Sequence, residues 1–164
     1  MSAVLMGGLV CGCAPPGKKS GSATAVTVLA KGTMPAMKLT VTLGEGQDPP
    51  TGKGPRSYAF DGPTEIVTQR VEVPPGGTVP WHFHNGYLMA TIVTGQFTQI
   101  LPCDVETPLT SSWTEFPGHV HAGANRTSAP VVYLVTMLIP KGKPPRVFVD
   151  PPGCDEPGGA TPAK

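Results

Sequence analysis

The feature that most constrains the fold is an apolar pattern with a period of two residues. In "VTQRVEV" (67–73), the odd-numbered positions would share one face of an extended chain, and most of them are valines. Between residues 26 and 150, no segment keeps the i, i+3, i+4, i+7 apolar spacing that an amphipathic helix needs. The pattern therefore predicts strands and no long helix.

Two longer apolar runs support the same interpretation. "YLMATIV" (87–93) and "VVYLVTMLI" (131–139) are rich in β-branched and aromatic residues, and each is flanked by glycine or proline. Such runs are typical of strands buried on both faces, so Met89 and Met137 are predicted to lie in the core. Several strands without helices predict an all-β sandwich or barrel.

The length and charge of the chain limit its organisation and its partners. With 164 residues and 39% hydrophobic content, the chain can form one core. A net charge of +1, without a Lys/Arg-rich run, argues against nucleic-acid binding. Because glycine and proline crowd the ends, we predict a disordered N-terminal segment (1–25), one β domain (26–150) and a Pro/Gly-rich tail (151–164).

The N-terminal segment combines a short apolar stretch with small residues and cysteines. Its "VCGC" (10–13) resembles the lipobox of bacterial lipoproteins, which implies a signal peptide that contains Cys11 and a lipid anchor on Cys13. No Lys or Arg precedes the apolar stretch, which is shorter than the roughly 20 residues that span a bilayer. A cytoplasmic N-terminus with two thiols is the alternative to an exported, membrane-anchored protein.

The two remaining cysteines form an even pair. Cys103 follows a strand-like run, and Cys154 lies in the tail. In an oxidising compartment they could form a disulfide bond that joins the tail to the domain. Two unbridged thiols are the alternative, because the sequence does not give their separation.

The four histidines of the chain form two H-x-H pairs, each preceded by a Pro/Gly turn. His82 and His84 form the first pair, and His119 and His121 form the second. Because side chains alternate across a strand, each pair would point to one side. Two such pairs suggest strands that meet in space, and imidazole suits divalent zinc, copper, iron and nickel.

The first pair resembles the first motif of the cupin superfamily, which reads G, five residues, H-x-H, three or four residues, E, six residues, G. Gly76, His82, His84 and Gly95 keep this spacing. Leu88 stands where the family has a glutamate ligand. The match therefore predicts a cupin site without the carboxylate of the first motif.

The second pair resembles the second cupin motif, P-x-G-x-x-H-x-x-x-N. Gly118, His121 and Asn125 stand at the expected intervals, while Pro117 is one place too close to the glycine. The resemblance covers about residues 65–139. It implies a single-domain cupin β-barrel, which is a double-stranded β-helix or jelly roll.

By this resemblance, His82, His84 and His121 are the ligands of one divalent metal ion in the mouth of the barrel. The ion could be Fe, Mn, Zn, Ni or Cu. Three protein ligands leave coordination positions open for water, dioxygen or substrate, as catalytic sites do. His119 is predicted to be catalytic, relaying a proton from beside the metal, with a role as fourth ligand as the alternative.

Two functions follow from the resemblance. The first is an exported metal enzyme, a dioxygenase or isomerase that acts on a small organic molecule. The second is a module at the cell surface that binds a small molecule or a metal ion without turnover.

The resemblance also implies that two copies can form a homodimer through barrel edges. Trp81, Tyr87 and Phe97 are predicted to serve packing.

Overall fold

The computed structural model describes residues 23–36, 38–43 and 56–153, and within them nearly all regular structure is β. The one helical element in these ranges is a short 3₁₀ turn at Pro102–Asp104. The strands are β1 (Ala25–Met34), β2 (Leu39–Leu43), β3 (Arg56–Phe60), β4 (Thr64–Val73), β5 (Thr78–Phe83), β6 (Tyr87–Thr94), β7 (Phe97–Leu101), β8 (Val105–Leu109), β9 (Ser112–Glu115), β10 (His121–Ala124), β11 (Val131–Pro140) and β12 (Val147–Phe148).

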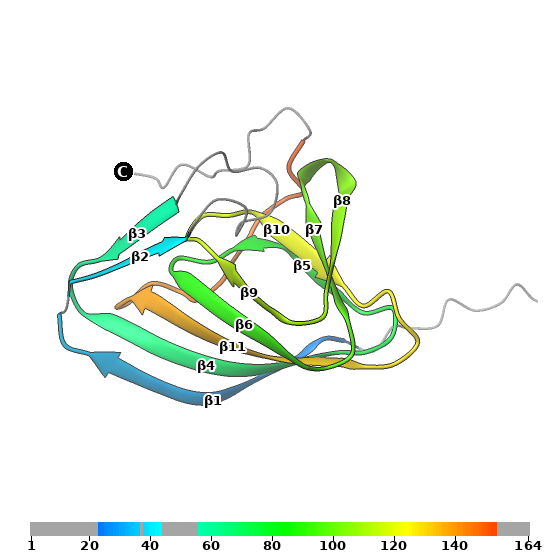
Figure 1. Cartoon of the computed structure of the whole chain (residues 1–164), viewed down its shortest axis with the longest axis horizontal. Coiled ribbons are helices and arrows are strands. Elements are labelled where there is room, and N and C mark those ends of the chain that lie inside the picture. The colour runs from blue at the N-terminus through cyan, green and yellow to red at the C-terminus, as the bar shows by residue number, and fades with distance from the viewer. Residues whose placement is uncertain (1–22, 37, 44–55, 154–164) are drawn as a thin grey trace, which may run out of the picture.

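Ten of these strands form two five-stranded antiparallel sheets that face each other (Figure 1). The first sheet has the order β1-β4-β11-β6-β9, and the second has the order β12-β5-β10-β7-β8. From β4 to β7 and again from β9 to β12, consecutive strands alternate between the two sheets, which produces a jelly roll. The prediction of an all-β jelly-roll barrel is confirmed.

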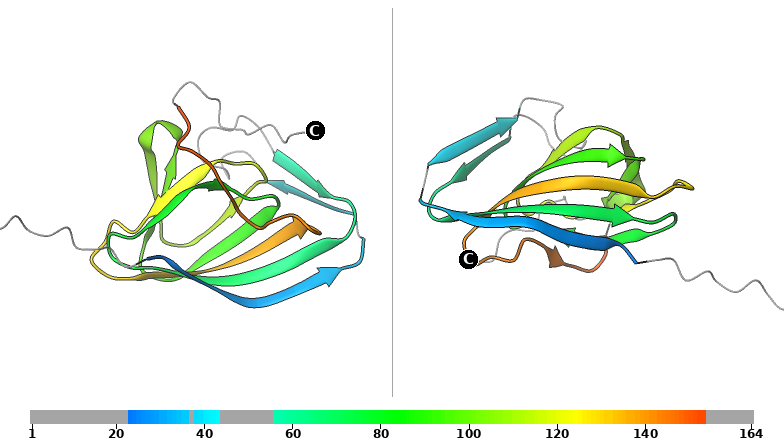
Figure 2. Two further views of the ribbon diagram at one scale, coloured as in Figure 1. Left: turned by 180° about the vertical axis from the view of Figure 1, so that it is seen from behind. Right: turned by 90° about the horizontal axis from the view of Figure 1, so that it is seen from below.

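The remaining strands, β2 and β3, form a separate hairpin at one end of the barrel (Figure 2). Phe60 of β3 packs in a small cluster with Tyr87 and Phe116. The hairpin is therefore attached to the barrel by apolar contacts rather than by extension of either sheet.

The main core lies between the two sheets, and β4 presents to it the face that the sequence indicates. Val67, Gln69, Val71 and Val73 are all buried, whereas the polar residues between them are only partly covered. Residues of β6, β7 and β11 complete this core. The period-two prediction for residues 67–73 is confirmed.

The prediction for the longer apolar runs is correct for Met137 and wrong for Met89. Met137 is 1% exposed, whereas Met89 is 43% exposed. The reason is that β6 lies in an antiparallel sheet whose outer face meets solvent, so alternate residues of the run point outward. Tyr87 and Phe97 are buried, as expected for packing residues, and Trp81 is partly buried.

The fold brings the two histidine pairs together. β5 and β10 pair antiparallel, with His82 opposite His121. His84 follows directly after β5, and its carbonyl oxygen accepts a hydrogen bond from the Gly118 amide at 2.9 Å. Gly118 has a φ of 78°, a conformation that favours glycine, so the second motif's glycine allows this turn to close against the first motif.

Asn125, the last residue of the second motif, is a structural residue. It is 1% exposed, and its Nδ2 donates to the carbonyl oxygens of Val73 (2.9 Å) and Ala129 (2.7 Å). Its Oδ1 accepts hydrogen bonds from the amide and the hydroxyl of Thr127. The side chain therefore fixes the loop between β10 and β11 onto the end of β4.

Three predictions concern residues beyond those described. Cys11 and Cys13 of the predicted signal lie outside the described residues, as does Cys154 of the predicted disulfide. No helix among the described residues is long and apolar enough to cross a membrane. The N-terminal disorder, the anchor and the Cys103–Cys154 bond stay predictions.

Replacing Asn125 with Ala is expected to lower the free energy of unfolding by about 2 to 4 kcal/mol, because buried backbone groups lose their partners. Chemical denaturation of metal-free protein measures this change. Thr91→Ala, which removes only an exposed hydroxyl pair with Ser112, is the control and should change stability little. A loss below about 0.5 kcal/mol for Asn125→Ala would show that this side chain is not needed for the loop.

Candidate metal centre

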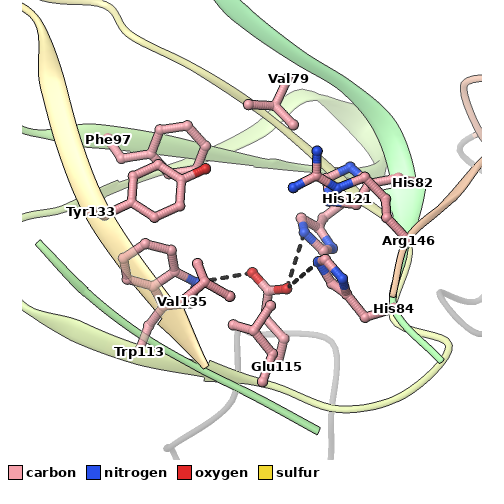
Figure 3. A pocket seen from close by; sticks show the side chains of 11 residues that line it. Val79, His82, His84, Phe97, Trp113, Glu115, His121, Tyr133, Val135 and Arg146 are labelled. Carbon is pink, nitrogen blue, oxygen red and sulfur yellow. Dashed lines mark hydrogen bonds and ion pairs between the residues drawn. The ribbon is translucent and has the colours of Figure 1, made fainter. Parts of the chain in front are cut away.

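The structure places three of the predicted site residues around one point inside the barrel. His82, His84 and His121 are each 3% exposed, and one ring nitrogen of each lies within 4.8 Å of the others (Figure 3). The ring centroids of His82 and His121, which face each other across β5 and β10, are 4.3 Å apart. The convergence that the spacing predicted is present.

Each of the three imidazoles is held by a hydrogen bond from its Nδ1 to a backbone carbonyl. The acceptors are Pro80 O for His82 (2.7 Å), Pro145 O for His84 (2.8 Å) and His119 O for His121 (3.0 Å). A carbonyl oxygen can only accept, so each Nδ1 carries the hydrogen. A neutral ring then presents the lone pair of Nε2 to the centre, which is the arrangement found for metal-bound histidine.

A fourth group at the centre, the carboxylate of Glu115, was missed by sequence reasoning. Its Oε2 lies 3.1 Å from Nε2 of His121 and 3.3 Å from Nε2 of His84. Its Oε1 accepts hydrogen bonds from Trp113 Nε1 at 2.9 Å and from Gln99 Nε2 at 3.2 Å. The Trp113 and Gln99 side chains therefore hold one oxygen and direct the other at the histidines. Figure 3 shows the contact with Trp113 and the two contacts with the histidines.

Glu115 replaces the carboxylate that the first motif lacks. β6 and β9 pair antiparallel, and Leu88 lies directly opposite Glu115 in that pairing. The acidic group is thus shifted by one strand. The three-histidine cluster that the resemblance implies is present, and Glu115 lies beside it as an additional group. Glu115 stands just before the second motif in the sequence, but the pairing that brings it beside Leu88 cannot be recognised from local spacing.

The pKa values of the three histidines are shifted in different directions and by different neighbours. Burial, with the neighbouring His121 and His84, lowers the pKa of His82 to about 2. Burial also lowers the pKa of His84 to about 4, although Glu115 partly opposes the shift. Burial would lower the pKa of His121 as well, but Glu115 outweighs it and raises that pKa above 6.5.

The carboxyl group of Glu115 stays ionised because it pairs with the same histidines. Burial alone would raise its pKa, but His121 and His84 hold the pKa below the usual 4.5. Without a metal ion, these shifts favour an ionised Glu115, neutral rings at His82 and His84, and a proton on His121 at and below pH 6.5.

The donor set and the distances from Glu115 fit a divalent transition metal ion. Three Nε2 lone pairs and a carboxylate oxygen would repel one another unless a cation lay between them. Ligands at about 2.0–2.2 Å from a metal lie roughly 3 to 3.5 Å apart, which matches the two distances from Glu115. Nitrogen and oxygen donors of this kind suit zinc, iron, manganese, nickel or copper.

The inner pocket is the space beside these four groups. Its volume is about 20 Å³, which is enough for roughly one water-sized group. Phe97, Trp113 and Tyr133 form an aromatic wall opposite the histidines, with ring centroids 5.0 to 6.0 Å apart. Burial raises the pKa of Tyr133, so its phenol stays protonated at neutral pH.

His119 lies behind the centre rather than in it. Its ring stacks on His121 with centroids 5.6 Å apart, and it is not among the residues that line the inner pocket. β10 begins only at His121, so His119 belongs to the preceding turn and does not share a strand face with it. Its carbonyl oxygen positions His121, and its predicted catalytic role stays a prediction.

Comparison with known proteins bears on the fold. No protein-family model and no curated protein sequence match the chain. A double-stranded β-helix protein from Klebsiella pneumoniae is similar over 52% of this chain and 75% of its own, with 20% identity and a TM-score of 0.45. A cupin domain from Bordetella pertussis is similar over 65% of this chain and 98% of its own, with 19% identity and a TM-score of 0.42.

A DMSP lyase from Ruegeria pomeroyi is similar over 54% of this chain, with 21% identity and a TM-score of 0.46. This chain spans only 45% of the length of that lyase. Similarity at this level says nothing about substrate. In its strand order the protein is a double-stranded β-helix, or jelly roll, which is the fold that the resemblance of its two histidine motifs implies.

Substitutions at the proposed metal ligands are expected to reduce metal binding by different amounts. His82→Ala and His121→Ala should abolish metal binding, and Glu115→Gln should weaken it by at least about 10-fold to 100-fold. His119→Ala should have less effect. Glu72→Gln, which removes a carboxylate on the outer face of β4, is the matched control. Equal metal content in all variants after dialysis would contradict the ligand assignment.

Metal binding at about pH 6 is expected to release at most about one proton, because the raised pKa of His121 favours its protonation there, whereas His82 and His84 are neutral. As pH rises toward the raised pKa of His121, metal affinity should increase about tenfold per unit and then level off. Calorimetry in buffers of different ionisation enthalpy measures the proton count. Release of two or three protons would contradict the assignment of the proton to His121. Glu115→Gln should reduce the number of protons released toward zero.

Proposed function

We propose that the protein binds one divalent transition metal ion through His82, His84, His121 and Glu115, and uses it to act on a small organic molecule. The observation that carries this proposal is the convergence of three buried imidazoles, whose ring nitrogens lie within 4.8 Å of one another, with Glu115 Oε2 beside those of His84 and His121. The three Nδ1 hydrogen bonds fix the rings in the orientation that a metal requires. Metal affinity is therefore built into the folded chain.

Catalysis is the function that the surroundings favour. A bound metal ion with an open position would polarise a substrate oxygen as a Lewis acid or, if redox-active, support dioxygen chemistry. The aromatic wall of Phe97, Trp113 and Tyr133 excludes water, and the protonated Tyr133 phenol can donate a hydrogen bond inside the pocket. A dioxygenase or isomerase is the reaction class that we propose.

A binding module without turnover is the second candidate, and the small inner pocket favours it. A volume of about 20 Å³ accepts a water molecule beside the metal but not a whole organic substrate. For catalysis, the body of the substrate must lie outside this pocket. For metal storage or sensing, no further space is needed.

The cellular setting forms part of the proposal. Export and a lipid anchor on Cys13 would place the metal centre at the outer surface of a membrane, where the Cys103–Cys154 pair could be oxidised. Pairing of two chains through an exposed strand edge would give a homodimer. These features depend on the sequence motifs described above.

Metal analysis of protein purified from its native host, followed by oxygen-uptake assays, is expected to separate the two candidates. The enzyme predicts about one metal ion per chain and turnover of a phenol, diketone or thiol that is lost in His82→Ala. Stoichiometric binding of these compounds without consumption would support the binding module. Protein that acquires no transition metal, even after incubation with Fe, Mn, Zn, Ni and Cu, would contradict both.

A further inference from the structure

Arg146 is a charged residue in the metal pocket that neither histidine motif contains. It lies between β11 and β12, and it lines the inner pocket together with the histidines and Glu115. In Figure 3 its guanidinium points toward the histidine cluster. The side chain therefore brings a permanent positive charge to the place where a cation would bind.

The segment that carries Arg146 is fixed by contacts to the metal-centre strand. Val147 and Phe148 of β12 pair with Phe83 and His82 of β5, and Figure 2 shows this segment returning from β11 along the barrel. The carbonyl oxygen of Pro145 accepts the hydrogen bond from His84 Nδ1. The position of Arg146 is thus tied to the position of a metal ligand.

The charge of Arg146 opposes metal binding, so its presence requires another reason. Burial is the larger influence on the pKa of all three imidazoles, and the guanidinium adds a further lowering. The same repulsion acts on a metal ion. A positive charge that weakens the metal site is useful if it binds an anion there.

The hydrogen-bonding state of Arg146 indicates the same role. Its Nε is shielded from solvent and has no hydrogen-bond partner among the described residues. The nearest acid that lines the pocket, Glu115, already uses its oxygens for Trp113, Gln99 and the histidines. No described carboxylate therefore pairs with this guanidinium.

Arg146 also lines a second space, which we call the outer cavity. It has a volume of about 210 Å³ and is lined by Val26, Gln69, Met137, Pro145, Arg146 and Phe148. Most of this lining is apolar. Arg146 lines both the inner pocket and the outer cavity, so the two spaces meet at its side chain.

The geometry points to Arg146 as the anion-binding residue of the site, and to a small monocarboxylate with an apolar body as its ligand. The carboxylate pairs with the guanidinium where the two spaces meet, and the apolar body occupies the outer cavity. Arg suits this role because its planar fork matches a carboxylate with two parallel hydrogen bonds. The inference rests on the proposed function, because it places the ligand beside the metal.

The test compares two probes of nearly equal shape and different charge, phenylacetate and phenylacetamide, on the metal-loaded full-length chain. We expect phenylacetate to bind at least tenfold more tightly than the amide. Arg146→Gln should weaken phenylacetate at least tenfold and change the amide less than twofold. Arg126→Gln removes an exposed arginine that pairs with Glu106 and should change neither.

The outcomes separate this inference from the function on which it rests. If the chain takes up no metal, the proposed function fails and this inference fails with it. If metal-loaded protein binds acid and amide equally, or if Arg146→Gln leaves phenylacetate binding unchanged, only the role of Arg146 is overturned. Arg146→Lys, which keeps the charge but loses the planar guanidinium, should give an intermediate affinity for phenylacetate. The comparison of the two probes on the unaltered chain requires no variant.

Discussion

The mutual repulsion of four electron-pair donors is the constraint on which the site depends. Ring nitrogens of three buried histidines lie within 4.8 Å of one another, and one oxygen of Glu115 lies beside two of them, where no water-rich surroundings can screen them. Such an arrangement is stable only with a positive charge at its centre. In the metal-free chain Glu115 raises the pKa of His121, which favours a proton there, and we infer that a metal ion replaces it.

The jelly roll makes this convergence possible by bringing distant segments to one place. β5 and β10 of one sheet provide the histidines, and β9 of the other sheet provides Glu115. Backbone carbonyls then set the tautomer of each ring, and one of them belongs to Pro145 in the segment that also carries Arg146. The anion-binding residue and the metal centre are therefore parts of one hydrogen-bonded unit.

Local patterns predicted the parts of this structure that depend on local spacing. The alternation of β4 is the periodicity of a single strand, so it indicated the buried face, and the H-x-H pairs suggested strands that meet in space. The choice of His82, His84 and His121 as one cluster came from the resemblance to the two cupin motifs. Glu115 and Arg146 enter the site only because β9 pairs with β6 and β12 pairs with β5. Such pairings join residues far apart in the chain, and no residue spacing encodes them. Met89 was misplaced because an apolar run does not reveal which of its faces meets solvent.

X-ray absorption at the metal edge reports the atoms that are bound to the ion. For the loaded protein, we expect scattering from three imidazole nitrogens and at least one oxygen at about 2.0–2.2 Å. Loss of one imidazole shell in a chain with His84→Ala would agree with it. A spectrum with no imidazole scattering, or one left unchanged by that substitution, would contradict the account.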